Sequence, residues 1–151
     1  LGHSTTIHTT DFSTIDYNNG WWKETPDGAS ITKENNALVI PNNNTGGNIW
    51  DLQLQIARGF NVQAGGNYIV RITMKATNSG QAQIVLGGWD NIGAMYNTLE
   101  FPQSDGYKTY EVEYYNSSIS DSNNGIHVLW QGRHYNGTAT ISKVEVIELQ
   151  K

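Results

Sequence analysis

The sequence contains no cysteine, which excludes disulfide bonds, thiolate metal sites and a cysteine nucleophile. Basic residues are also scarce: nine Lys and Arg against fourteen Asp and Glu give a formal net charge of −5. Because phosphate backbones are bound by basic patches, no nucleic acid is expected as a partner. No apolar run approaches the ~18 residues of a membrane-spanning helix, so no membrane is expected as a partner either.

The residues that are present favour strands and turns. A length of 151 residues predicts one domain. Sixteen glycines and a charged fraction of only 15% are more typical of strands joined by turns than of helices. Short segments of alternating apolar and polar residues recur along the chain, separated by turn signals. We therefore predict an all-β fold, a two-sheet antiparallel β-sandwich (jelly roll) with a concave binding face.

The alternation is clearest between residues 46 and 76. Leu52, Leu54 and Ile56 alternate with polar residues, so they should share one face of a strand and point into the core, with Gln53 and Gln55 on the opposite face. A second strand repeats the pattern with Tyr68, Val70, Ile72 and Met74. Further turn signals are expected at Glu34-Asn35-Asn36, Asn78-Ser79-Gly80, Asp105-Gly106 and Asn136-Gly137.

Catalytic constellations are weak in this sequence. Glu111 and Glu113 share one strand face, and their spacing suits a glycosidase pair on paper. Both lie among tyrosines in an ordinary amphipathic strand, however, so a solvated sheet face is the preferred interpretation. The four histidines lack the spacing of a zinc site, and no nucleophile elbow is present. No catalytic residue is therefore assigned.

A sugar-binding face is better supported. Planar amides satisfy the hydroxyl rim of a sugar and aromatic rings cover its apolar face. Strand faces opposite the core carry an unusual number of glutamines, with tryptophans nearby at strand ends. For Trp50 and Tyr96 a core position is an open alternative, and for Trp89 loop packing is. The candidate ligand-binding residues are Trp50, Gln53, Gln83, Trp89, Tyr96, His127 and Gln131.

Three segments also resemble a known family. They are Trp50-Asp51-Leu52-Gln53, the strand that begins Gly65-Gly66-Asn67-Tyr68, and the ending from Gln131-Gly132 to Gly137-Thr138-Ala139-Thr140-Ile141-Ser142-Lys143-Val144-Glu145-Val146. Together they resemble the carbohydrate-binding modules of the family 4/9/22 type, which accompany bacterial xylanases and glucanases. The resemblance implies that Trp50 lies against the sugar, that His127 and Gln131 line a cleft, and that one of Trp21 and Trp22 is a core residue while the other is half exposed.

The resemblance also implies a function and its setting. The expected function is non-catalytic binding of soluble β-1,4-linked plant cell-wall polysaccharide, with xylan or xylo-oligosaccharide favoured over β-glucan. The expected protein is a secreted or cell-surface, monomeric module excised from a larger glycoside hydrolase. Residues 1–4 are interpreted as a cloning remnant and residues 5–151 as the carbohydrate-binding β-sandwich module. Two alternatives stay open, a small jelly-roll glycan-active enzyme using Glu111 and Glu113, and an adhesion domain that binds no sugar.

Many relatives of this type hold a structural calcium ion. The resemblance implies an acidic ligand directly after the first Phe and an aspartate in the last strand. In this sequence Ser13 and Ser142 stand at those positions. Calcium sites need several oxygen ligands with carboxylates among them. We therefore expect no calcium, or a weakly held ion, and no other cofactor.

Overall fold

The chain folds into two antiparallel sheets packed face to face. The computed structural model describes residues 3–25, 30–42, 48–120, 125–132 and 135–150. Within these residues one sheet has six strands, β1 (Ser4–Thr9), β3 (Thr32–Glu34), β4 (Ala37–Asn42), β6 (Asn67–Ala76), β9 (Ser104–Tyr115) and β11 (Gly137–Leu149). The other has five, β2 (Lys23–Glu24), β5 (Gln53–Arg58), β7 (Gly80–Gly87), β8 (Met95–Phe101) and β10 (His127–Gln131). This confirms the predicted all-β sandwich.

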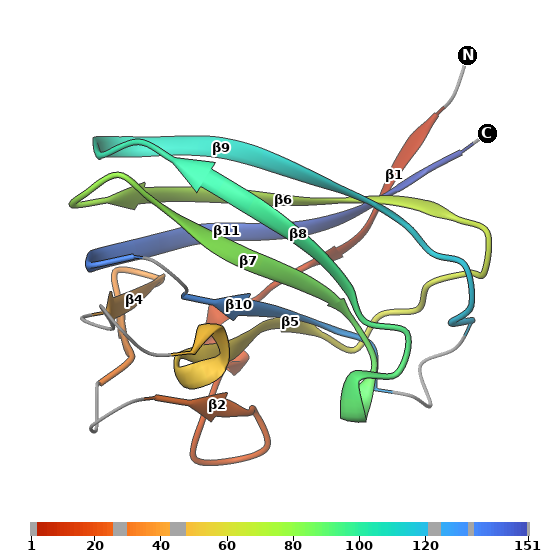
Figure 1. The fold of residues 1–151 in the computed structure, drawn as a ribbon, viewed down its shortest axis with the longest axis horizontal. Coiled ribbons are helices and arrows are strands. Elements are labelled where there is room, and N and C mark those ends of the chain that lie inside the picture. Colours follow the sequence, from red (N-terminus) through yellow and green to blue (C-terminus); the bar gives the residue numbers. More distant parts are fainter. Residues whose placement is uncertain (1–2, 26–29, 43–47, 121–124, 133–134, 151) are drawn as a thin grey trace.

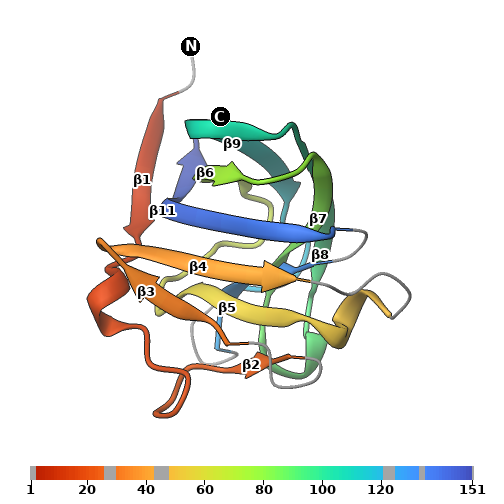
Figure 2. The same cartoon turned by 90° about the vertical axis from the view of Figure 1, so that its left-hand side faces the viewer.

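Strand order in the two sheets places the chain ends together. The six-stranded sheet runs β3-β4-β11-β6-β9, and β1 pairs with the C-terminal half of β11 beyond the end of β4 (Figure 2). Ser4 opens β1 and pairs with Leu149, so both termini lie at the same end of the sandwich (Figure 1). The five-stranded sheet runs β2-β5-β10-β7-β8. Helical structure in the described ranges is limited to the single 3-10 turns η1 (Phe12–Thr14), η3 (Ile49–Asp51) and η4 (Trp89–Asn91), and none is long enough to cross a membrane.

The core lies between the sheets and follows the predicted alternation. Leu52, Leu54 and Ile56 of the β5 segment are fully buried, as are the four alternate apolar residues of β6. Together with the β5 residues, Ala82, Ile84 and Leu86 of β7 and Trp130 of β10 form the layer of the five-stranded sheet that packs against the six-stranded sheet. Each fully buried side chain of this size contributes on the order of 2 kcal/mol from the area it removes from water. The polar residues that alternate with them therefore emerge on the outer faces of the sheets.

Two predicted turns have different outcomes. The Glu34-Asn35-Asn36 turn is confirmed, because Asn35 and Asn36 both have left-handed φ values, 50° and 62°, as a tight hairpin turn requires. The Asp105-Gly106 turn is wrong, because both residues lie inside β9. The chain turns earlier, at Pro102 and Gln103, and crosses there from β8 in one sheet to β9 in the other.

Candidate functional site

Polar side chains cross the five-stranded sheet in a row. Gln131 of β10 lies opposite Gln53 of β5 on one side and Gln83 of β7 on the other. Gln53 is opposite Glu24 of β2, and Gln83 is opposite Thr98 of β8. Residues directly opposite each other in a ladder point to the same face. The row therefore spans all the strands of this sheet, on the face away from the core.

The amides of this row hold one another in place. Gln131 Nε2 donates to Gln53 Oε1 at 3.0 Å, and Gln53 Nε2 donates to Glu24 Oε2 at 3.2 Å. Gln53 and Gln131 are only 9% and 7% exposed. Gln131 Oε1 is buried without a hydrogen-bond partner within the described part of the chain. These glutamines are thus ordered groups built into the sheet and not mobile surface side chains.

A second polar pair lies one row along the same face. Gln55 Oε1 accepts from the backbone N–H of Trp22 at 2.9 Å, and Gln55 Nε2 lies 3.0 Å from His127 Nδ1. Gln55 is fully buried and His127 is 5% exposed. Burial disfavours the imidazolium and lowers the pKa of His127 from 6.5 to about 4, so its ring is neutral at neutral pH.

A pocket of about 360 Å³ is lined by His127 of this pair. Two tryptophans stand at it, Trp22 at the β2 edge and Trp89 in the turn after β7, with exposed fractions of 38% and 43%. The lining residues are Trp22, Gln53, Gly88, Trp89, Asp90, Asn91, His127 and Leu129. The pocket thus combines two exposed indoles with the Gln53 amide, the His127 ring and one apolar side chain, Leu129.

Trp89 is held in a closely packed turn. Asp90 and Asn91, which follow it, have left-handed φ values of 57° and 62°, conformations that non-glycine residues adopt at a cost. The Trp89 ring meets the His127 ring edge-on, with centroids 4.9 Å apart. It also covers Gly125, where a Cβ would lie 1.6 Å from Trp89 Nε1. The indole is therefore fixed at the pocket before any ligand arrives.

The predicted site residues are only partly brought together. Gln53, Trp89 and His127 line the pocket, and Gln83 and Gln131 belong to the adjoining amide row. Trp50 and Tyr96 do not line it, and the open alternative of a core position is wrong for both, because they are 52% and 51% exposed. Trp50 lies in η3, before the start of β5, whereas Trp89 lies at the end of the sheet where β5 finishes.

Sequence reasoning missed two residues of the site. The resemblance implies one core and one half-exposed residue at Trp21-Trp22 without assigning which is which, and this is confirmed, because Trp21 is only 7% exposed while Trp22 is 38% exposed and lines the pocket. The alternation correctly predicts Gln55 on the outer face, but Gln55 is not among the candidate ligand-binding residues. The sequence does contain a signal for Gln55, because Gln55 shares the alternation phase of Gln53. The sequence contains no such signal for Trp22, because the position of Trp22 at the pocket depends on the pairing of β2 with β5.

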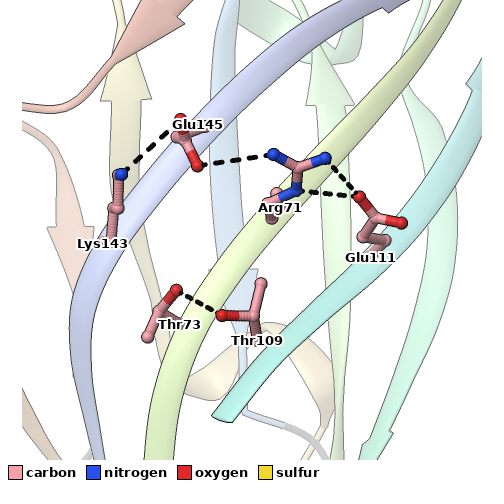
Figure 3. A network of polar contacts seen from close by, with 6 residues as sticks. All are labelled: Arg71, Thr73, Thr109, Glu111, Lys143 and Glu145. Atoms are coloured by element: carbon pink, nitrogen blue, oxygen red, sulfur yellow. Dashed lines mark hydrogen bonds and ion pairs between the residues drawn. The ribbon is translucent and has the colours of Figure 1, made fainter. Parts of the chain in front are cut away.

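The carboxylates considered for catalysis lie on the other sheet. Glu111 of β9 is opposite Arg71 of β6, and its Oε2 accepts from Arg71 Nε at 2.8 Å (Figure 3). Arg71 Nη1 also lies 3.8 Å from Glu145 Oε1 of β11. Glu113 is opposite Ile69 on the same sheet. Glu111 is thus part of a surface ion network, and both glutamates lie on the sheet that does not carry the pocket.

The two serines at the implied calcium positions have hydrogen-bond partners within the protein. Ser13 donates to Asp11 Oδ1 through both its backbone N–H and its Oγ, at 3.0 and 2.7 Å, and these bonds lower the pKa of Asp11. Lys33 Nζ donates to the Ile15 carbonyl just after η1, at 2.8 Å. In the ranges that the structure describes, no cluster of three or more His, Asp or Glu residues could hold a metal. The two implied positions therefore carry neutral hydroxyls where the resemblance implies carboxylates.

Comparison with known proteins shows which solved structures share this fold. No family model and no curated protein matches the chain, but solved structures do. The structure named BiXyn10A CBM1, in its apo form, aligns with a TM-score of 0.75 at 20% identity, over 93% of this chain and 96% of its own. The second N-terminal cellulose-binding domain of β-1,4-glucanase C from Cellulomonas fimi gives a TM-score of 0.69 at 17% identity, over 95% and 94%. A family 29 carbohydrate-binding module gives 0.59 at 16%, over 99% and 89%. The chain thus has the β-sandwich fold of carbohydrate-binding modules, as its sequence resemblance predicted.

Proposed function

We propose that this chain is a non-catalytic module that binds a linear β-1,4-linked plant cell-wall polysaccharide. The observation that carries the proposal is the pair of exposed indoles, Trp22 and Trp89, at a pocket that is also lined by Gln53, a buried glutamine whose amide is bonded to Gln131 in the adjoining row. Indoles cover the C–H face of a pyranose, and fixed amides satisfy its hydroxyls without reordering. The similar solved structures support it by name, since they include a cellulose-binding domain and a family 29 module complexed with cellulohexaose.

The shape of the sheet favours a chain lying across the strands. One row runs from Gln55 through Leu129 and Val85 to Tyr96, with Trp22 beside Gln55 at the β2 edge. Four steps between neighbouring strands at ~4.8 Å span about 19 Å, which accommodates about four pyranose units of an extended chain. Tyr96 would then contact the end of the ligand opposite Trp22.

Expected affinities are modest. One sugar ring on one indole removes roughly 80–100 Å² of apolar surface from water, or about 2 kcal/mol. Two such contacts and several hydrogen bonds, less the cost of ordering both partners, give a dissociation constant between about 1 μM and 1 mM. Such binding is useful when the module is tethered to an enzyme and raises its local concentration at the polymer. We therefore propose a secreted or cell-surface monomer attached to a glycoside hydrolase.

Xylan is the favoured ligand because the sequence resembles xylanase-associated modules. Affinity electrophoresis through gels containing xylan, β-glucan, mannan or no polysaccharide tests this choice. Retardation by xylan, with no reducing ends released, is the expected result. Retardation by β-glucan alone would replace xylan with a glucan ligand, and free migration in every gel would leave the adhesion alternative.

We also propose that the fold needs no calcium. The support is the donor set around Ser13 and the ammonium of Lys33 at the Ile15 carbonyl. Thermal unfolding in excess calcium and in excess chelator should give the same midpoint. A midpoint that rises with calcium concentration would contradict the proposal.

A further inference from the structure

The Trp22 backbone N–H, the Gln55 amide and the His127 ring form a chain of hydrogen bonds beside the pocket. In this chain each atom can act only as a donor or only as an acceptor. A backbone N–H can only donate, so the Gln55 atom that faces the Trp22 N–H at 2.9 Å is the amide oxygen. The NH₂ group of Gln55 must then face His127 Nδ1, 3.0 Å away. An amide NH₂ can only donate, so Nδ1 accepts. In a neutral imidazole this places the proton on Nε2.

The arrangement around Gln55 is rigid. Its backbone N–H donates to the Trp22 carbonyl at 3.0 Å, and its own carbonyl accepts from the Tyr17 hydroxyl at 2.7 Å. Its side chain is fully buried. Because main chain and side chain are both bonded to the Trp22 segment, the amide cannot rotate without leaving a buried group unpaired, which is costly. The orientation of the Gln55 amide is thus set by the fold.

His127 Nε2 has no hydrogen-bond partner within the described ranges, and His127 lines the pocket. We propose that Gln55 is a positioning residue that holds His127 with its proton on Nε2, so that the pocket presents a fixed donor to an acceptor oxygen of the sugar. The part of this inference that concerns the ligand rests on the proposed function. The part that concerns the tautomer does not, because the contacts exist in the free protein.

Within the described ranges, the charged groups near the His127 ring have other partners or face the pocket. Arg58 is opposite His127 in the β5–β10 ladder, and its guanidinium lies over the Trp21 ring and donates to the Gly20 carbonyl. Asp90 lines the pocket from η4. Gly87, opposite His127 on β7, carries no charge. Gln55 is accordingly the group that faces Nδ1.

The first test needs no ligand. Nitrogen NMR of the His127 ring in the free chain at pH 7 should show a protonated Nε2 and an unprotonated Nδ1. The substitution Gln55→Glu keeps the shape of the side chain and an oxygen for the Trp22 N–H, but it places an acceptor at Nδ1. In this variant, the neutral ring at high pH should carry its proton on Nδ1 only. At lower pH the charged ring should carry protons on both Nδ1 and Nε2.

The second test measures ligand selection with xylohexaose, or with cellohexaose if that is the ligand found. Gln55→Glu should bind about five-fold more weakly at pH 8, the effect of one lost hydrogen bond, and should recover as the ring protonates at lower pH. The affinity of the wild-type protein should stay constant as the pH is lowered from 8 over the range in which the variant recovers. For the tautomer measurement, the matched control is Gln83→Glu, which changes a residue on the same face that has no histidine contact. This variant should leave the His127 tautomer unchanged.

The outcomes separate the two proposals. A wild-type ring with its proton on Nδ1, or a Gln55→Glu ring unchanged from wild type, would overturn the positioning role. The expected tautomers with weakened, pH-dependent binding of the variant support it in full. The expected tautomers with pH-independent binding in both proteins would overturn the selection step. The expected tautomers with no binding to any oligosaccharide would refute the proposed function while Gln55 keeps its effect on the ring.

Discussion

Arg71 on the six-stranded sheet and Gln53 on the five-stranded sheet both lie on outward-facing polar surfaces, but in different surroundings. Arg71 is 37% exposed in its side chain and pairs with Glu111, itself 45% exposed. Gln53 is 9% exposed and is bonded on both sides, to Gln131 and Glu24. The Arg71 contacts join exposed charged side chains (Figure 3), whereas the Gln53 contacts join side chains of the row that crosses the five-stranded sheet, of which Gln53 and Gln131 are buried.

The difference separates solvation from recognition. Exposed ion pairs contribute little because water competes for both partners and long side chains must be ordered. Buried amides have already lost that freedom on folding, so a ligand that meets them pays little further ordering cost. Exposed tryptophans stand beside the amide face, at the pocket. The two faces should therefore respond differently to mutation.

The largest effect is expected from removing both indoles. The double substitution Trp22→Ala and Trp89→Ala should weaken polysaccharide binding by more than about 100-fold, because each indole contributes about 2 kcal/mol of buried apolar contact. Isothermal titration with the oligosaccharide measures the loss. Tyr115→Ala, which removes a 60% exposed aromatic side chain from β9, is the matched control. A double variant that binds like wild type would show that the pocket is not the site.

Acid should destabilise the fold through His127. Its folded pKa of about 4 lies below the ordinary 6.5, so between these values the unfolded chain binds a proton that the folded chain does not. The free energy of unfolding should thus fall as pH drops from 6.5 to 4, by at most about 3 kcal/mol. Burial lowers the pKa of His8 as well, which acts in the same direction. Urea unfolding at several pH values measures the slope, and His127→Gln should remove most of it. An equal slope in that variant would assign the effect to other groups.

Displacing Trp89 without deleting it should have an intermediate effect. In Gly125→Ala the new Cβ would lie 1.6 Å from Trp89 Nε1, so the indole must move. Binding should weaken about ten-fold, short of the loss of a whole indole contact. Gly65→Ala shares the left-handed backbone, with φ +81° against +65°, but meets no neighbouring atom. Both substitutions should lower the free energy of unfolding by roughly 1 kcal/mol, and Gly65→Ala should leave the affinity intact.

The smallest effect is expected on the charged face. Glu111→Gln removes the carboxylate from the Arg71 network, but the pair is well exposed, so the free energy of unfolding should change by less than about 1 kcal/mol. Affinity should stay at the wild-type value, since Glu111 lies on the six-stranded sheet. Equilibrium unfolding and titration check both. A clear loss of binding would show that the ligand contacts the six-stranded sheet, which would contradict the proposed binding face.

The sequence is a good guide to what a single strand determines. Alternation assigned the core and outer faces of the β5 and β6 segments correctly, because the two-residue period is a local property of the strand. Gly87-Gly88 before Trp89 and Asp90-Asn91 after it similarly indicated an exposed tryptophan in a polar turn, and Trp89 is 43% exposed there. These features need no knowledge of neighbouring strands.

Contacts between distant segments could not be predicted from the sequence pattern. Trp22 reaches the pocket because β2 pairs with β5, about 30 residues along the chain, and no local pattern reports that pairing. The turn signal at Asp105-Gly106 was overridden because β9 continues through it far enough to pair Ser104 with Ala76 of β6. Which sheet a strand joins, and hence which polar residues become neighbours, is set by this long-range pairing.

The most direct test of the account is an NMR titration of the free chain with xylohexaose, with cellohexaose in parallel. Shifts are expected at the indole N–H groups of Trp22 and Trp89 and at the backbone amides of β10, whereas the amides of β9 and the Arg71 side chain should not shift. Shifts that gather on β6, β9 and β11, while both indoles stay unchanged, would contradict the assignment of the five-stranded sheet as the binding face.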